Sequence, residues 1–135
     1  MEVIFKGLSP ISSNGYIIYC DKTRDGFIID PGEKGKSFLE DIKELNLNIK
    51  GIILTHHHGD HCGGVKVIIN ELKCDVYISE IDKEHSNVNI TKTLKDGDEI
   101  FVGEDKLVVI NTPGHTEGSI VLYCENDKKI FTGDT

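Results

Sequence analysis

The sequence predicts one domain of the α/β or α+β class, in which helices cover a sheet. Its 135 residues are about the length of a single domain. Short apolar runs bounded by turn residues alternate along the chain with two longer stretches of helical periodicity. The composition, 38% hydrophobic and 28% charged, is typical of a folded chain and not of a disordered one. Strands and helices of this kind bury their apolar faces against each other.

The elements of the first half follow from local patterns. Residues 16–20 and 27–29 are expected to be strands, because an Asp-Gly hairpin signal lies between them. Residues 37–45 and 65–72 carry apolar side chains at helical spacing, which predicts two amphipathic helices. The nearly continuous apolar run at 49–54 is typical of a strand that is buried on both faces.

The second half is predicted to be mostly β-structure. Its short apolar runs are separated by residues that favour turns. The expected strands are residues 75–78, 99–102, 106–110, 119–124 and 129–132.

Charge and composition exclude several classes of function. The net charge is −8 and Arg24 is the only arginine, which disfavours binding to nucleic acid or to an anionic membrane. No apolar run approaches the ~18 residues of a membrane span, and no secretory signal is expected. None of the cysteines Cys20, Cys62, Cys74 and Cys124 forms a C-x-x-C pair. We therefore expect reduced, mostly buried thiols in a cytoplasmic protein.

A dense histidine cluster directly follows the predicted buried strand. Side chains two residues apart in an extended segment point the same way, so His56 and His58 can converge on one point. Gly59 allows a sharp turn, after which Asp60 and His61 can face a second point. Such imidazoles and carboxylates are the ligands that zinc and similar first-row ions prefer. The alternative is a histidine-rich exposed loop, which four histidines beside an aspartate make the weaker interpretation.

Two later strand ends repeat this arrangement. The Pro113-Gly114 turn after the strand at 106–110 can present His115. The strand at 129–132 is followed by Asp134, whose carboxylate can bridge two cations. Taken alone, each is an ordinary surface or turn residue. If the strand ends lie side by side, however, both reach the histidine cluster.

These motifs resemble those of a known superfamily. Residues 55–61 match the H-x-H-x-D-H motif of the metallo-β-lactamase fold hydrolases. Residues 112–116 resemble the next histidine motif of that superfamily, and residues 131–135 resemble its bridging-aspartate motif. Residues 14–16 and 30–32 look like its early strand signatures. The resemblance covers essentially the whole chain, and the glyoxalase II-like (hydroxyacylglutathione hydrolase-like) branch is the most similar.

The resemblance implies an αββα sandwich, of which this chain would supply one half plus the start of the second. Residues 1–135 would then form one metallo-β-lactamase-like domain that is incomplete at its C-terminus. It also implies two metal ions per complete site, expected to be Zn²⁺, with iron or manganese as alternatives. Asp60 would in addition be catalytic, by accepting a hydrogen bond from the attacking hydroxide. The implied ligands are His56, His58 and His115 for the first metal, Asp60 and His61 for the second, and Asp134 as the bridge.

Several neighbouring residues have other interpretations. His57 occupies a variable position of the motif and is expected to be structural, as is Cys62. His85 is expected to be a surface residue. Asp30 either orients a ligand imidazole, as metal-bound histidines commonly require, or only begins the turn at Pro31. Both interpretations of Asp30 remain open at this point.

The chain departs from the superfamily where it ends. Members of that superfamily continue beyond the bridging aspartate and add one more metal-binding histidine. A half-sandwich would leave one apolar sheet face uncovered, which implies a partner. We expect a truncated product that pairs through that face as a homodimer or domain swap. A fragment of a longer hydrolase and a compact, repacked protein are the alternatives.

The resemblance implies a metal-dependent hydrolase that directs a metal-bound hydroxide at a thioester or similar small acyl substrate. One alternative is a persulfide dioxygenase-like enzyme with a single iron held by two histidines and a carboxylate. The other is a metal-binding half-domain without turnover. The partner expected in the first two cases is a small molecule.

Overall fold

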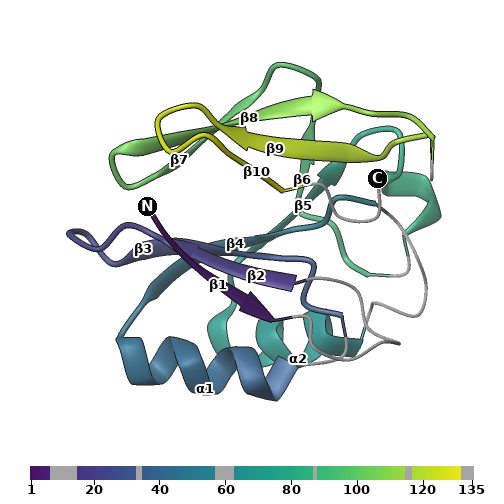
Figure 1. Cartoon of the computed structure of the whole chain (residues 1–135). Helices are drawn as coiled ribbons and strands as arrows, with labels where there is room; N and C mark the ends of the chain where they lie inside the picture. Colours follow the sequence, from purple (N-terminus) through teal and green to yellow (C-terminus); the bar gives the residue numbers. More distant parts are fainter. Residues whose placement is uncertain (7–14, 33–34, 57–62, 87, 115–116, 132–135) are drawn as a thin grey trace.

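The protein is a sandwich of two β-sheets with two helices on the outside of the larger sheet (Figure 1). This arrangement comes from a computed structural model of the whole chain. Among the residues it describes, no helix combines the length and the apolarity that a membrane crossing requires. The structure describes residues 1–6, 15–32, 35–56, 63–86, 88–114 and 117–131.

The first sheet has six strands in the order β1-β2-β3-β4-β5-β6. The pairs β1–β2 and β2–β3 are antiparallel, whereas β3, β4, β5 and β6 are parallel neighbours. The carboxyl ends of parallel strands lie at the same edge of the sheet. Each pair of parallel strands also needs a long crossover connection to join them. The bounds are β1 (Glu2–Lys6), β2 (Gly15–Tyr19), β3 (Asp25–Ile29), β4 (Asn48–Ile53), β5 (Asp75–Ser79) and β6 (Lys92–Leu94).

Two helices supply the crossovers, as the helical periodicity predicts. Helix α1 (Gly35–Leu45) connects β3 to β4, and helix α2 (Gly63–Leu72) connects β4 to β5. A short 3₁₀ helix, η2 (Lys83–His85), follows β5. The two helices begin close together, because a Cβ on Gly64 would lie 2.3 Å from the carbonyl oxygen of Gly32.

The second sheet has four antiparallel strands in the order β10-β9-β8-β7. The side chains of β7 and β8 alternate between the interior and the outer face, as in a strand with one buried face, whereas every residue of β9 except Tyr123 is buried. In β7, for example, Ile100 and Val102 are buried while Glu99 and Phe101 are exposed. The bounds are β7 (Glu99–Val102), β8 (Asp105–Asn111), β9 (Ile120–Cys124) and β10 (Lys129–Phe131).

Apolar side chains fill both spaces between the layers. The core between the two sheets includes Ile18 and Ile53 from the first sheet and Val109 and Leu122 from the second. The core between the first sheet and the helices is built around Phe38 and other fully buried residues. The described cysteines Cys20, Cys74 and Cys124 are free thiols, two of them buried and Cys74 half-buried.

The expected αββα class is confirmed, with one correction about the uncovered face. We expected a helix-covered sheet whose other face would be open. Instead, β7–β10 pack on that face, because the alternating apolar residues of 99–131 form a sheet of their own. The face without a helix over it in the described ranges is the outer face of this second sheet (Figure 1). Phe101 and Ile130 on that face are 62% and 55% exposed.

Candidate metal centre

Three strand ends meet at one end of the sandwich, as the sequence predicts. The backbone amide of Ile120, at the start of β9, donates to the carbonyl oxygen of Thr55, just after β4, at 2.9 Å. β10 runs antiparallel to β9, so it leads toward the same end. Its last residue, Phe131, packs against Tyr16 with ring centroids 5.0 Å apart, and Tyr16 pairs in register with Ile29. Asn111, the last residue of β8, pairs with Ile120. The carboxyl ends of β4, β8 and β10, the three strands that precede the predicted ligands, therefore lie at the same end of the sandwich.

His56 is the one predicted ligand within the part of the chain that the structure describes. It lies directly beyond β4, and it is 6% exposed. No group of three or more potential metal ligands occurs among the described residues. The other candidates of the motifs lie outside those residues: His57, His58, Asp60, His61, Cys62, His115 and Asp134. The side chain of His85 also lies outside them, although its backbone belongs to η2.

A chain of hydrogen bonds holds the His56 ring. The Thr55 hydroxyl donates to the Asp30 carboxylate with an oxygen–oxygen distance of 2.5 Å. The same hydroxyl oxygen lies 3.0 Å from Nδ1 of His56. The Thr55 backbone amide donates to the other oxygen of Asp30 at 2.9 Å. Asp30 and Thr55 are 4% and 1% exposed, so the contacts are shielded from water.

These contacts determine which ring nitrogen carries the proton. An ionised carboxylate only accepts hydrogen bonds, so the single proton of the Thr55 hydroxyl goes to Asp30. The hydroxyl oxygen must then accept from His56, which assigns the ring proton to Nδ1. When the ring is neutral, a proton on Nδ1 leaves the lone pair on Nε2, as a metal-ligating histidine requires. The described part of the site therefore fits a first-row metal.

Asp30 combines the two roles that the sequence left open. It begins the turn at Pro31 with a positive φ of 46°, a conformation that aspartate adopts more readily than most residues. It also supports the orientation of His56, through the Thr55 hydroxyl that contacts both residues. Burial raises the pKa of the neighbouring Tyr16 hydroxyl, and the charge of Asp30 raises it further. Nothing in the sequence pattern marks Thr55 as the residue that connects Asp30 to His56.

The connection between β8 and β9, which contains the His115 motif, is closed at its base. The backbone amide of Thr112 donates to the carbonyl oxygen of Ser119 at 2.8 Å. The backbone amide of Gly118 donates to the Asp82 carboxylate at 3.0 Å. The base of this connection is thus fixed beside the segment that presents His56.

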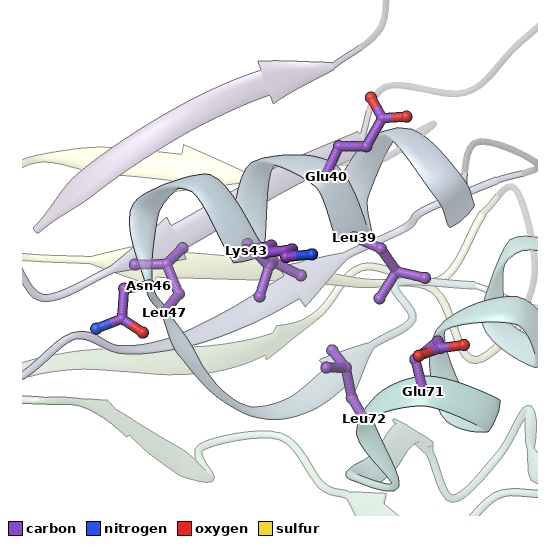
Figure 2. A pocket seen from close by; sticks show the side chains of 8 residues that line it. Leu39, Glu40, Lys43, Asn46, Leu47, Glu71 and Leu72 are labelled. Carbon is purple, nitrogen blue, oxygen red and sulfur yellow. The ribbon is translucent and has the colours of Figure 1, made fainter.

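A groove of about 430 Å³ lies elsewhere, between α1 and the end of α2 (Figure 2). Asn46 and Leu47 on its wall precede the start of β4, whereas His56 follows the end of that strand. The groove therefore lies at the opposite end of β4 from the candidate metal centre. Its lining residues are Leu39, Glu40, Ile42, Lys43, Asn46, Leu47, Glu71 and Leu72.

The fold and the oriented histidine define a class of protein, a helix-covered β-sandwich with a candidate metal centre at its strand ends. More specifically, the chain belongs to the metallo-beta-lactamase superfamily, whose family model matches residues 8–135.

Comparison with individual proteins places the chain near enzymes of this superfamily. It is 33% identical over 129 residues to a hydroxyacylglutathione hydrolase of Bdellovibrio bacteriovorus, covering 94% of this chain and 51% of that protein. The crystal structure of the BLEG-1 B3 metallo-beta-lactamase matches with a TM-score of 0.85 and 23% identity, over 97% of this chain and 71% of the other. The structure of ETHE1 from Myxococcus xanthus matches with a TM-score of 0.80 and 29% identity, over 98% and 56%. The chain spans about half the length of the curated relatives it matches.

Proposed function

We propose that this chain forms the metal-binding part of a metal-dependent hydrolase that acts on a thioester or similar small acyl substrate. The observation that carries the proposal is the buried Asp30–Thr55–His56 chain, which holds His56 in the metal-ligating tautomer. Membership of the metallo-beta-lactamase superfamily supports it. The choice of a thioester rests on the relatives named hydroxyacylglutathione hydrolase.

The proposed ligand roles follow the motifs. His56, with its lone pair on Nε2, joins His58 and His115 at the first metal. Asp60 and His61 serve the second metal, and Asp134 bridges the two. A cation in this site lowers the pKa of water to about 7 and polarises a substrate carbonyl, and zinc is the proposed ion. Asp60 is the proposed catalytic carboxylate.

The residues of the described part prepare the site rather than react. Asp30 and Thr55 keep the His56 ring in one orientation, so that ring rotation need not be suppressed when the site assembles. Thioester hydrolysis joins a water oxygen to the acyl carbon, breaks the C–S bond and leaves the sulfur protonated as a thiol. The released thiol gives a direct assay.

A second candidate is the mononuclear iron enzyme of the persulfide dioxygenase-like type. The chain is nearly as similar in sequence to ETHE1, at 29%, as to the hydroxyacylglutathione hydrolase, at 33%. Sequence similarity therefore does not choose between hydrolysis and another reaction on the same fold. Oxygen consumption with a persulfide of a small thiol, in the iron-loaded protein, separates the two.

The test of the proposed function combines metal content with turnover. We expect native mass spectrometry to detect bound zinc in the wild-type protein, and a hydroxyacyl thioester of glutathione to release thiol. His56→Ala should lose zinc and activity, whereas the histidine control His85→Ala should keep both. Zinc binding without hydrolysis would support the non-catalytic half-domain instead. Equal zinc content in His56→Ala and the wild type would refute the proposed ligand role.

A further inference from the structure

Asp82 is a fully buried carboxylate within a charged stretch of the sequence. It lies in a charged stretch after β5, at the N-cap of η2, yet it is 0% exposed. Removing a carboxylate from water is expensive unless hydrogen bonds or charges compensate for it. The backbone gives one such bond, because the amide of Gly118 donates to Oδ1 of Asp82 at 3.0 Å. This bond joins two connections that are 36 residues apart in sequence.

Gly118 is shaped to accept this contact. A Cβ at position 118 would lie 2.5 Å from Oδ1 and 2.6 Å from Cγ of Asp82, distances that real Cβ atoms essentially never show. It would also lie 2.8 Å from the Asp82 backbone nitrogen. A side chain at 118 would therefore push the β8–β9 connection away from the end of β5. The contact therefore needs both the Asp82 carboxylate and a residue without a side chain at position 118.

The hydrogen bond between Asp82 and Gly118 lies at the base of the β8–β9 connection, which contains the His115 motif. Directly after Gly118, the carbonyl oxygen of Ser119 accepts from the Thr112 amide and closes that base. One residue further, the Ile120 amide donates to the carbonyl oxygen of Thr55, the residue that orients His56. Asp82 is thus hydrogen-bonded to a backbone segment that is also hydrogen-bonded to Thr55, the neighbour of His56.

We infer that Asp82 is a positioning residue of the proposed metal centre, which acts through the Gly118 amide to fix the described base of the β8–β9 connection beside Thr55 and His56. The inference rests on the proposed function, since it assigns His115 and His56 to one metal. Asp82 contacts neither metal nor substrate in this role. Its carboxylate is a fixed hydrogen-bond acceptor for the Gly118 amide, at the base of the β8–β9 connection.

The test measures metal affinity rather than turnover. Zinc affinity by competition with a chromophoric chelator, and the visible spectrum of the Co²⁺-loaded protein, are compared between the wild type, Asp82→Ala and Asp82→Asn. Asp82→Ala should weaken zinc binding by about tenfold or more, as expected for the loss of an outer-shell partner, and should alter the Co²⁺ spectrum. Asp82→Asn keeps an acceptor oxygen and should recover most of the affinity.

A matched control separates positioning from general stability. Ser79→Ala changes a buried residue at the end of β5, just before the connection that holds Asp82. The Ser79 hydroxyl accepts from the Ile81 amide, a contact within its own segment. It should leave the Co²⁺ spectrum unchanged. Urea unfolding of the metal-free proteins reports the loss of stability in each variant. If Asp82→Ala fails to fold, Asp82→Asn and Gly118→Ala still report on the contact, and an unchanged zinc affinity in Gly118→Ala would overturn the inference.

The outcomes separate the positioning role of Asp82 from the proposed function. If the wild type binds zinc and Asp82→Ala weakens binding no more than Ser79→Ala does, the inference is wrong and the proposed function stands. If the wild type binds neither zinc nor Co²⁺, the proposed function fails and the inference fails with it. Weaker binding confined to Asp82→Ala and Gly118→Ala supports both.

Discussion

Thr55→Val is the substitution that tests the orientation of His56 most directly. Valine has nearly the shape of threonine, so the change removes the hydroxyl between Asp30 and His56 with little loss of packing. The hydroxyl makes a 2.5 Å hydrogen bond to a buried carboxylate, and hydrogen bonds to charged groups contribute about 1.5–3 kcal/mol. The free energy of unfolding of the metal-free protein should fall by about that amount. The Thr55 backbone amide still donates to Asp30, so the carboxylate keeps one bond of the pair.

Metal affinity should fall as well, because the His56 ring loses the acceptor that fixes its tautomer and orientation. Substitution of such an outer-shell partner typically weakens metal binding by about 10- to 100-fold. The assay is zinc competition with a chromophoric chelator, with urea unfolding of the metal-free protein alongside it. Thr55→Ser is the matched control, because it keeps the hydroxyl and removes a methyl from a site that is 1% exposed. We expect it to lose about 1 kcal/mol of stability and little zinc affinity.

The comparison of the two variants decides the question. Equal zinc affinities for Thr55→Val and Thr55→Ser would refute the orienting role of the hydroxyl, whatever their stabilities. Lower affinity in Thr55→Val, together with an intact fold by circular dichroism, would support it.

Three other substitutions test features away from the metal centre. The hydrogen bond between the Met1 ammonium and Asp105 raises the pKa of the ammonium and lowers that of the carboxyl. Asp105→Asn should therefore lower the free energy of unfolding by about 0.2–1 kcal/mol at pH 6. Urea unfolding across pH measures the difference in free energy of unfolding between the wild type and Asp105→Asn. This difference should disappear as the pH falls through the lowered pKa of Asp105, and also as it rises through the raised pKa of the Met1 ammonium. A difference that stays constant with pH would contradict the ion pair as its cause. Hydrogen bonds, first of all from the Thr23 side chain, lower the pKa of Cys20 to about 7. The ¹³Cβ chemical shift of Cys20 reports the buried thiol without a reagent having to reach it, and its titration midpoint should lie near that pH and move upward in Thr23→Val. An unmoved midpoint would exclude the Thr23 contact as the cause. Phe101→Lys places a charge on the exposed outer face of the second sheet, so it should reduce the fraction of any dimer that native mass spectrometry detects. A wild-type protein that stays monomeric at micromolar concentration would refute pairing through that face.

Strong local patterns predicted most of the fold. The apolar run at 49–54 became β4 almost residue for residue, because a strand buried on both faces needs continuous apolar side chains. Helix α1 begins at Gly35, two residues before the predicted start. Of its periodic apolar residues, Phe38 and Ile42 are buried, whereas Leu39 and Leu45 are half-buried. The strand β1 was not predicted, since its residues are all exposed or half-buried and show no clear alternation. Nor was β6, which has only three residues.

The candidate site could be predicted as far as its motifs, but not as far as the contacts that support it. His56 lies directly beyond β4, where the histidine cluster placed it. The roles of the ligands outside the described residues stay predictions. Thr55 and Asp82 gave no local signal, because a threonine beside a histidine and an aspartate in a charged stretch are both ordinary. Their partners, Asp30 and Gly118, are 25 and 36 residues away, and only the folded sheet brings them together.

The Asp30-Pro31-Gly32 turn holds both flanks of the histidine segment. Asp30 binds Thr55 just before that segment, and the carbonyl oxygen of Gly32 accepts from the Gly64 amide just after it, at 2.8 Å. Asp30 and Gly32, on either side of Pro31, therefore hold Thr55 and Gly64 at a fixed separation. Closing a loop whose ends are already held carries a smaller entropic penalty than closing a loop with free ends. For the proposed metal centre, part of this entropic penalty would thus already be offset by the folding of the sheet, independently of ion binding.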